Sequence, residues 1–593
     1  MPIRFLPMNK KILFIIFSLI IGVGIFLRFH NLRGTQFTWD QENLIAYPAA
    51  DILINHHLTL IGGKASVGNL YLGPLYSYLA ALFFAIFNMD PIAGVILSSF
   101  LSVITMIFGF LMVKKLFGIV TAVYFTLIWS VSTFVIHFDR IPWNVNILPL
   151  SSLLTTCGLL FALENRRKLG WLLVGIGLFL GMNSQFSVIL FIFIILLFLL
   201  LNKRIIDRSL LIAFLLLSLS VLPLIVFELR HGFPVIGNFY TFSASSITKF
   251  SQIIVRMKRI GGLILESMGR VLLFDGLSWI QKTLGLFLII SLAFLIKNDK
   301  RIRNFFQVYI LYLVVYFLCF SFYSNTVSEY YFIGILPVSM IGIALLFKKV
   351  HERYKEIVIL IIILSVIILN RSYLFVQSED SHSLAIKQQI LSKIKEESGD
   401  KPISVVYDME SGWSYGYDYL LDYYKIKKTD RGNTADIFWL SFPKSRFPGK
   451  PDYIFGDFAL GLPSTSQKIL TTKNVDLYNL LRLRIPREWV VLQCPDVDFD
   501  NYLLTEDKGA SCLSSSGGVQ LGVLVRNLPN CNLKNMKDKK ELKIQSQLLF
   551  YTTGEMVITA LEKDRCIVLT DLGNKEIFPI SSIMSDILES ARR

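Results

Sequence analysis

The chain has 593 residues, of which 53% are hydrophobic, and its mean hydropathy is +0.56. This composition excludes a soluble globular class, and the length exceeds that of one ordinary domain. The formal net charge of +16 does not indicate nucleic-acid binding, because Lys and Arg cluster in short loops between apolar segments, as the positive-inside rule predicts. We therefore expect a polytopic α-helical membrane protein with no nucleic-acid partner.

The first apolar run, residues 11–29, lacks a small-residue cleavage site and is followed by further apolar runs. We therefore interpret it as a membrane anchor and not as a removed signal peptide. Arg4, Lys10 and Lys11 precede this run, which predicts a cytoplasmic N-terminus in a plasma or inner membrane. The chain then enters a first outer loop with juxtamembrane helices, residues 31–90.

The apolar stretch 74–87 is only as long as an interfacial or re-entrant segment. If it lies along the outer face, residues 91–113 return the chain to the cytoplasm, and the Lys/Arg clusters at 114–115, 166–168, 203–208, 297–303 and 348–355 all face inward. About eleven spans fit this map, the last of them ending near Asn370. The outer segments that follow from the map are the turns 137–146 and 181–187, the loop 228–272 and the loop 322–331.

Residues 371–593 differ in character from the transmembrane domain, residues 1–370, and predict a separate extracytoplasmic α/β or α+β domain. The stretches "ISVVYDM", "YGYDYLLDYYKI" and "ADIFWLSF" read as strand, helix and strand, and "CIVLT" reads as a further strand. An even number of cysteines outside the cell permits two disulfides, although the four can equally remain unpaired. These cysteines are Cys494, Cys512, Cys531 and Cys566.

Two carboxylates, Asp40 and Glu42, follow the first span in the stretch "GTQFTWDQENLIAY". If a helix begins after Trp39, Asp40 shares one face with Asn43 and Tyr47. In the alternative, Thr38 or Asp40 merely caps that helix. We favour a functional site because other outer segments add polar residues at the membrane boundary. These residues are Asp139, Arg140, Trp143, Asn144, Asn146, Glu228, Arg230 and His231.

Residues 247–270 form an amphipathic pattern, with apolar side chains at helical spacing on one face and basic side chains on the other. The apolar face consists of Phe250, Ile253, Ile254, Met257, Ile260, Ile264 and Met268, and the other face of Lys249, Gln252, Arg256 and Arg259. Because the map places this helix outside, it could bind an anionic lipid head group through charge-assisted hydrogen bonds. Ordinary adsorption to bulk anionic lipid is the alternative.

The stretches "WDQENLIAYPAADILINHHLTLIGGK" and "YLGPLYSYLAALFFAIF" resemble the start of the GT-C superfamily of polytopic glycosyltransferases. The resemblance is to the bacterial protein-mannosyltransferase-like and aminoarabinose-transferase-like groups and covers roughly residues 10–350. Family members have an Asp/Glu motif after the first span, and then a Pro-Pro-Leu-Tyr segment where this chain has Gly73-Pro74-Leu75-Tyr76. They also have an Arg-containing turn after the third span, similar to "DRIPWN".

The resemblance implies a GT-C fold and the transfer of a sugar from a polyprenyl-phosphate donor to a glycan, lipid or protein acceptor at the outer membrane face. It implies an inverting displacement without a metal or other cofactor, with Asp40 as the catalytic base and Glu42 as its assistant. Such a base takes the proton of the acceptor, while cations stabilise the departing phosphate. The candidate phosphate ligands are Arg140, Arg230, His231, Arg256 and Arg259, and the candidate acceptor or sugar ligands are Asn43, Tyr47, Trp143, Asn144, Gln185 and Tyr330.

The chain departs from the family pattern at three places. Tyr71-Leu72 stands where aminoarabinose-transferase-like enzymes have Glu-Lys, Asn183-Ser184-Gln185 where relatives often have Thr-Lys-Gly, and Pro142-Trp143-Asn144 where they have Arg-Pro-Asp. The family's phosphate and acceptor contacts are therefore not carried over to these positions.

Two alternatives to an active transferase remain. A transporter or flippase of a lipid-linked sugar predicts Gly- or Pro-broken spans in matching halves, a pattern that is not seen in this sequence. A catalytically inactive relative could instead bind glycans through the aromatic stretch "SGWSYGYDYLLDYY".

Overall fold

The structure is a computed structural model of the chain. It describes most of residues 10–469, and after residue 469 it describes strands only. The gaps before residue 469 are residues 66–69, 246–251, 275, 297–298, 370–381, 411, 430–435 and 448–449.

The chain divides into two compact units. The membrane unit comprises residues 1–35 and 43–378, and the C-terminal unit comprises residues 36–42 and 379–593. The predicted domain boundary at residue 370 lies outside the described residues. The segment 36–42, which follows the first span in sequence, is part of the C-terminal unit.

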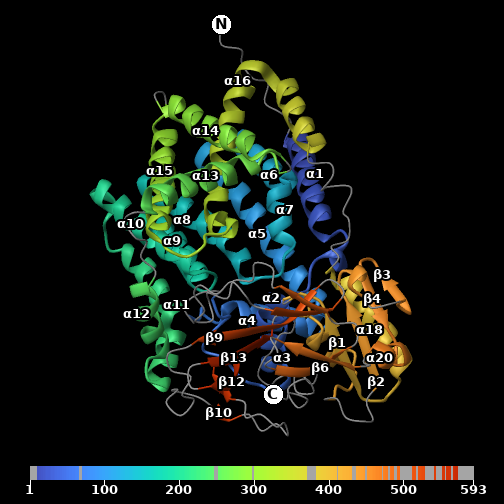
Figure 1. Cartoon of the computed structure of the whole chain (residues 1–593). Coiled ribbons are helices and arrows are strands. Elements are labelled where there is room, and N and C mark those ends of the chain that lie inside the picture. The colour runs from blue at the N-terminus through green and yellow to red at the C-terminus, as the bar shows by residue number, and fades with distance from the viewer. Residues whose placement is uncertain are drawn as a thin grey trace. The chain divides into compact units, whose positions relative to one another are not determined.

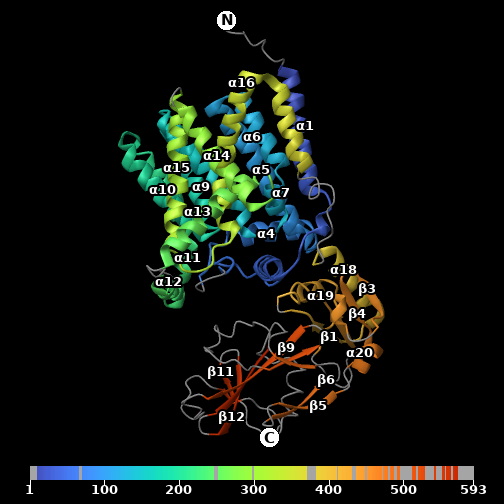
Figure 2. The ribbon, with the colours of Figure 1, turned by 45° about the horizontal axis from the view of Figure 1, so that its top comes forward.

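The membrane unit is a bundle of helices, coloured blue to yellow in Figure 1 and seen from another side in Figure 2. Its helices are α1 (Lys10–Phe29), α3 (Tyr47–Ile54), α4 (Leu75–Ile86), α5 (Ile92–Phe117), α6 (Ile119–Val131), α7 (Thr133–Arg140), α8 (Leu148–Leu163), α9 (Arg167–Met182), α10 (Ile189–Leu201), α11 (Leu210–His231), α12 (Pro234–Ser245), α13 (Ile253–Arg270), α14 (Ser278–Leu295), α15 (Lys300–Phe322) and α16 (Leu336–Leu369).

Six helical segments among the described residues are long and apolar enough to cross a membrane. The number is seven if α6 and α7, which are bent by 60° at their junction, form one span. The predicted multi-pass helical class is therefore confirmed, while the count of eleven spans stays a prediction. Helix α4 has 12 residues, fewer than a bilayer needs, which agrees with the prediction that residues 74–87 do not cross.

Helix α5 illustrates how local sequence sets the ends of a span. At its start, the Asp90 carboxylate accepts a hydrogen bond from the backbone N–H of Ile92 at 3.0 Å, which satisfies an otherwise unpaired donor. At its end, Gly118 adopts a φ of 93°, and its N–H donates to the carbonyl of Lys114. Such a left-handed residue terminates a helix most easily when it is glycine.

Helices α8 and α9 approach each other closely in the middle of the membrane unit. A Cβ atom on Gly158 of α8 would lie 2.6 Å from the carbonyl oxygen of Gly170 of α9, and a Cβ on Gly177 would lie 2.7 Å from the carbonyl oxygen of Ser151. Small residues permit this backbone approach, which is how helices gain packing energy in a bilayer. Helix α8 is almost entirely buried and forms the centre of the core.

The C-terminal unit begins with a small mixed sheet that has the strand order β1-β2-β4-β3. Strands β1 and β2 are parallel, with Ile403 opposite Asp436, and α19 lies between them in sequence. This arrangement confirms the predicted strand, helix and strand. The elements, with α18, α19 and α20 labelled beside the sheet in Figure 2, are α18 (Leu384–Ser398), β1 (Ile403–Asp408), α19 (Asp418–Tyr423), β2 (Asp436–Ser441), β3 (Tyr453–Phe455), β4 (Phe458–Gly461) and α20 (Pro463–Ile469).

The rest of the C-terminal unit is antiparallel. A seven-stranded sheet has the order β10-β11-β12-β13-β9-β8-β7, and β5 pairs with β6. The predicted strand "CIVLT" lies within β13. The predicted disulfides fall on cysteines whose side chains lie outside the described residues. The strands are β5 (Thr472–Leu477), β6 (Leu481–Pro486), β7 (Val490–Gln493), β8 (Ser511–Ser515), β9 (Gly518–Asn527), β10 (Lys540–Glu541), β11 (Tyr551–Thr553), β12 (Met556–Glu562) and β13 (Arg565–Asp571).

Candidate active site

The helix predicted after the first span is present, and it begins at α2 (Trp39–Gln41). The side-chain oxygen of Gln41 accepts hydrogen bonds from the backbone N–H and the hydroxyl of Thr38, both at 2.9 Å. Thr38 is therefore the residue that starts the helix, and Asp40 is not its cap. A π-helical turn, Glu42–Ala46, follows. The prediction that Asp40, Asn43 and Tyr47 share one face assumed 3.6 residues per turn, and this spacing does not hold across a π-helical turn.

Asp40 is a partly buried carboxylate in the C-terminal unit. Burial raises its pKa above the usual value of an aspartate, because desolvation disfavours the charged form. No hydrogen-bond or ion-pair partner of this carboxylate is found among the residues that the structure describes. Asp40 thus has the desolvated environment typical of a catalytic acid or base, and no visible structural task.

Glu42, the second predicted catalytic residue, does have a structural task. Its side chain is 1% exposed, and its two oxygens accept the backbone N–H groups of Gly416 and Tyr419, each at 2.9 Å. These bonds satisfy the carboxylate inside the C-terminal unit. Glu42 therefore anchors its own segment to the start of α19.

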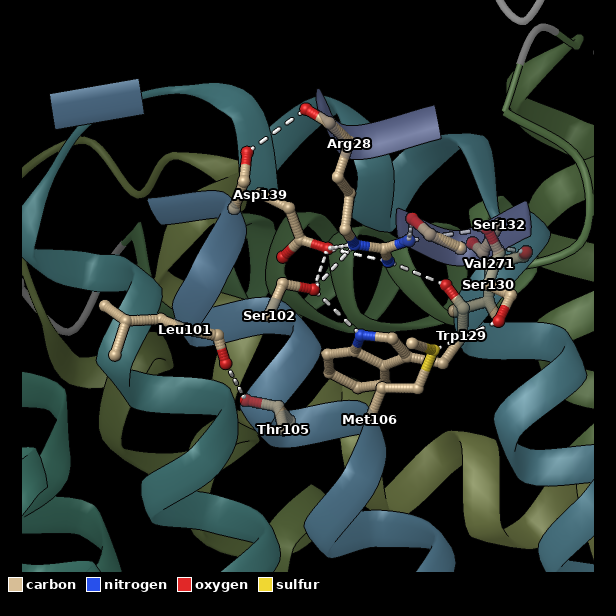
Figure 3. A network of polar contacts seen from close by, with 12 residues as sticks. Arg28, Leu101, Ser102, Thr105, Met106, Trp129, Ser130, Ser132, Asp139 and Val271 are labelled. Carbon is tan, nitrogen blue, oxygen red and sulfur yellow. Dashed lines mark hydrogen bonds and ion pairs between the residues drawn. The ribbon is translucent and has the colours of Figure 1, made fainter. Parts of the chain in front are cut away.

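A buried ion pair joins α1, the first span, to α7, the helix that ends at Arg140. Arg28 of α1 is fully buried, and its guanidinium lies 2.8 Å from the Asp139 carboxylate of α7. The same guanidinium donates to the hydroxyl of Ser102 at 2.7 Å and to the carbonyl of Trp129 at 2.8 Å. Figure 3 shows how these groups converge from α1, α5, α6 and α7. The network therefore fixes four helices at one point of the membrane unit.

Arg140, the residue after Asp139, has a different partner. It is buried, and its Nη2 donates to the carbonyl of Asn31 at 2.8 Å, directly after α1. The neighbouring charges Asp139 and Arg140 are thus not a pair with each other. Both connect α7 to the end of the first span.

Trp143 and Tyr330, two predicted sugar ligands, lie together in the membrane unit. Their ring centroids are 5.1 Å apart, and the Trp143 Nε1 donates to the side-chain oxygen of Asn146 at 2.9 Å. Both rings are only partly buried. They form an aromatic pair with accessible surface, which suits contact with a sugar or a polyprenyl chain.

The turns 142–146 and 181–187 are tied to each other. The side-chain amide of Asn144 donates to the carbonyl of Ser184, and the Ser184 hydroxyl donates back to the carbonyl of Asn144 at 2.9 Å. The side-chain oxygen of Asn183 accepts the N–H of Leu75 at 3.2 Å, and the closeness of Asn183 leaves no room for a Cβ on Gly73. Two predicted outer turns and the start of α4 therefore meet.

Gln185 differs from its neighbours in this turn. Its side chain is buried, and neither atom of its amide has a hydrogen-bond partner within the described part of the chain. A buried amide without partners is unfavourable unless something else satisfies it. Gln185 thus remains a candidate ligand for a bound molecule.

A cavity of about 530 Å³ lies in the membrane unit, between the helical part of the first outer loop and the residues that follow it. Two predicted acceptor ligands, Asn43 and Tyr47, line it, as do Asp51, Thr59 and Ser77. Its lining combines polar and apolar side chains, which is typical of a ligand site.

The predicted phosphate ligands near residue 230 are exposed. Arg230 and His231 both face outward at the end of α11, and the His231 ring stacks on Phe227 with centroids 4.3 Å apart. Glu228 is buried, and its carboxylate accepts the backbone N–H groups of Val235 and Ile236 at the start of α12. This segment shows no desolvated cationic site in the described residues.

Helix α13 confirms part of the predicted amphipathic helix. Of the predicted apolar face, Ile253, Ile260, Ile264 and Met268 are buried within the protein, whereas Ile254 is 77% exposed. Lys249 and Phe250 lie outside the described residues. The Arg256 guanidinium donates to the carbonyls of Tyr323, Ser324 and Asn325, which follow α15, and Arg259 is exposed. Arg256 thus binds the start of the loop 322–331. Its guanidinium donates to carbonyls that have no helical partner after α15 ends.

Three further buried cations within the described ranges were not predicted from the sequence: Arg28, Lys387 and Arg446. Arg28 stands out in the sequence as a charge within an apolar run, and such charges usually face the bundle interior. Lys387 carries no comparable signal, because it lies in a polar helix. No group of three or more His, Cys, Asp or Glu that could hold a metal ion exists among the described residues, and metal independence stays a prediction.

Comparison with known proteins gave one family match. The family described as dolichyl-phosphate-mannose-protein mannosyltransferase matches residues 72–227. The matched residues include Arg140 and the turns 142–146 and 181–187, whereas Asp40 precedes them. No curated protein sequence matches the chain.

Solved structures with a similar chain course were also found. ArnT from Cupriavidus metallidurans bound to undecaprenyl phosphate is 8% identical, over 77% of this chain and 98% of that chain, with a TM-score of 0.49. The same protein in the apo state gives 9% identity, coverages of 76% and 98%, and a TM-score of 0.46. The Archaeoglobus fulgidus oligosaccharyltransferase in complex with zinc and sulfate is 11% identical, over 73% of this chain and 68% of that chain, with a TM-score of 0.42.

Proposed function

We propose that this chain is a GT-C-type membrane glycosyltransferase that takes its sugar from a polyprenyl-phosphate donor, a proposal that the family match over residues 72–227 supports. The acceptor is an extracytoplasmic glycan, lipid or protein. The charge pattern supports a cytoplasmic N-terminus and an extracytoplasmic C-terminal unit in a cell membrane. The family description, which names a lipid-phosphate sugar, supports this donor class.

The observation that carries the proposal is the state of Asp40. Its neighbours Thr38 and Glu42 both make bonds that hold the fold, whereas the Asp40 carboxylate is desolvated and has no partner among the described residues. A partly buried carboxylate without a counter-ion carries a desolvation cost that no contact within the described residues offsets. Its presence at this position is therefore better explained by chemistry than by folding.

In the proposed reaction, Asp40 accepts the proton of the acceptor hydroxyl or amine as that atom attacks the anomeric carbon of the donor sugar. The bond between this carbon and the phosphate oxygen breaks, and the polyprenyl phosphate leaves with the electron pair. Attack from the opposite side inverts the anomeric centre. General-base catalysis suits this step because the lipid phosphate is already a good leaving group.

Arg140 is the strongest candidate for stabilising the departing phosphate. Among the five cations predicted to bind phosphate, Arg140 is the one that is buried. It also lies within residues 72–227, which the family matches. Arg256 already binds three carbonyls, while Arg230, His231 and Arg259 are exposed. A desolvated guanidinium interacts more strongly with a phosphate than an exposed one does.

Changing Arg140 to Lys is expected to lower kcat/KM for the donor by roughly tenfold to a hundredfold, because charged hydrogen bonds contribute about 1.5–3 kcal/mol. Initial rates at varied donor concentration measure this effect. Arg33→Lys is the matched control. Arg33 lies just after α1, close in sequence to Asn31, the partner of Arg140, and it pairs with Asp90 at 2.6 Å. Equal rates for the two variants would remove Arg140 from the mechanism.

The acceptor is proposed to bind the cavity that Asn43 and Tyr47 line, with the aromatic pair Trp143 and Tyr330 contacting the sugar or lipid. Gln185 offers a buried amide for a polar group. Asn144 supports this region through its bonds to Ser184.

The pH dependence of the rate tests the role of Asp40. A general base must be ionised, so the rate falls as the pH drops through its pKa in the folded protein. Because burial raises the pKa of Asp40, the acid limb of kcat/KM should lie at a higher pH than for an ordinary aspartate. An acid limb at or below the usual aspartate range would contradict the assignment.

The direct experiment uses purified protein and a panel of radiolabelled polyprenyl-phosphate hexoses and pentoses, with membrane extract as the acceptor source. The proposal predicts release of free polyprenyl phosphate together with labelled acceptor. Transport of the intact donor across a vesicle bilayer, without cleavage, would instead indicate a flippase. Binding without cleavage or transport would indicate an inactive relative.

A further inference from the structure

We propose that Lys387 and Glu42 are positioning residues, which clamp the two ends of the segment 36–42 to the C-terminal unit and so hold Asp40 in place for catalysis. This inference rests on the proposed function of Asp40. It gives the C-terminal unit a direct part in the reaction, beyond covering a site or binding an acceptor. All contacts that carry it lie within the C-terminal unit.

Lys387 holds the first end of the segment. It is 0% exposed on α18, and its ammonium donates to the carbonyl of Phe37 at 2.7 Å and to the carbonyl of Tyr415. The ammonium also lies 4.6 Å from the ring centroid of Tyr417. Burying a lysine is unfavourable unless its charge is well compensated, so these contacts form a specific arrangement.

The backbone at Gly416 is shaped for this contact. Gly416 has a φ of 89°, and a Cβ atom there would meet the Phe37 carbonyl at 2.2 Å. Glycine alone combines this backbone conformation with such a close approach. Glycine at position 416 therefore allows this loop of the C-terminal unit to lie against the segment 36–42.

Glu42 holds the other end. Its carboxylate accepts the N–H groups of Gly416 and Tyr419, so the loop that receives the Lys387 bond at Tyr415 also donates to Glu42. Hydrogen bonds to a charged acceptor are stronger than neutral ones. The Lys387 ammonium, which bonds to Phe37 and to Tyr415, therefore links the first end of the segment to the loop that binds its other end at Glu42.

Further contacts extend the clamp along the segment. Gln36 pairs with Ser383 in an antiparallel bridge, and the Phe37 N–H donates to the carbonyl of His382 at 3.2 Å. The Trp39 ring lies 6.4 Å from the ring of Tyr415. Asp40 stands between the two clamped ends, so its carboxylate is positioned by residues more than 340 positions later in sequence.

The test replaces each clamp in the full-length protein and measures kcat and KM for the labelled donor. Lys387→Met keeps an unbranched side chain of nearly the same length and removes both carbonyl bonds. We expect kcat to fall by about tenfold to a hundredfold with KM for the donor nearly unchanged, since a small misplacement of a reacting group costs on this order. Glu42→Ala should have a similar effect, and Glu42→Gln, which keeps one acceptor oxygen, a smaller one.

Lys395→Met is the matched control. Lys395 lies on the same helix and also donates to a backbone carbonyl, that of Tyr424 at 2.7 Å, but it does not contact the segment 36–42. Its replacement should leave kcat unchanged. If Lys395→Met lowers kcat as much as Lys387→Met, the effect belongs to the fold of the C-terminal unit and the clamp is refuted.

Two further measurements separate positioning from loss of structure. The double variant Lys387→Met/Glu42→Ala should lose less activity than the product of the single losses, because both residues hold one segment. Hydrogen exchange at the amides of Gly416 and Tyr419 should speed up in Glu42→Ala while the amides of β1 and β2 keep their protection. Unchanged exchange at these two amides would refute the clamp, and this measurement needs no enzymatic activity. An inactive wild-type protein would refute only the proposed function.

Discussion

Asp40→Asn is expected to abolish sugar transfer while the protein stays folded. Asparagine has nearly the same shape as aspartate but cannot accept a proton from the acceptor. Loss of a general base lowers rates by roughly a hundredfold to ten-thousandfold, so kcat should fall by at least the lower of these factors. Turnover of the labelled polyprenyl-phosphate sugar measures the effect, and donor binding should persist.

The substitution should not destabilise the fold, for a reason that the structure supplies. Burial raises the pKa of Asp40, which means that the folded protein disfavours the charged carboxylate. A neutral amide removes this penalty, and no hydrogen bond within the described residues is lost. The thermal unfolding midpoint of Asp40→Asn should therefore equal or exceed that of the wild-type protein.

Asp457→Asn is the matched control for this prediction. Asp457 belongs to the same unit and lies 3.5 Å from Lys444, but its side chain is 59% exposed. Its replacement removes a carboxylate without affecting the proposed chemistry, so kcat should be unchanged. A normal rate in Asp40→Asn would show that the transfer reaction does not use Asp40 as its base.

The sequence predicted the helical membrane class and much of the local structure because these depend on short-range patterns. Apolar runs and Lys/Arg clusters locate helices such as α1 and α11, and the alternation around Ile403 predicts strand β1. Such features need no knowledge of distant contacts. The contact between the turns at Asn144 and Ser184, by contrast, was seen only in the structure.

The roles of individual polar residues could not be predicted in the same way, because they depend on partners far away in sequence. Glu42 looks like a second catalytic carboxylate until its bonds to Gly416 and Tyr419 are seen. Arg256 looks like a phosphate ligand, yet it binds the carbonyls that follow α15. Both residues satisfy backbone groups, which a sequence pattern does not reveal.

Arg28→Met should be among the most destabilising single changes in the membrane unit. The variant leaves the Asp139 carboxylate buried without its counter-ion and also removes the bonds to Ser102 and the Trp129 carbonyl. Breaking a buried ion pair by removing one partner costs about 3–5 kcal/mol. Denaturant unfolding in mixed detergent micelles, followed by tryptophan fluorescence, measures the change in the free energy of unfolding.

A double variant and an exposed pair show whether the charge itself is responsible. Arg28→Met/Asp139→Leu should recover much of the lost stability, because the remaining buried charge is removed as well. Arg33→Met breaks a pair with Asp90 in which the Arg33 side chain is 43% exposed, so it should cost only about 0–1 kcal/mol. If Arg28→Met were no worse than Arg33→Met, the network in Figure 3 would not be what joins α1 to α7. If it is worse, the network holds α1 to α7 within the membrane unit, and activity should decline together with stability.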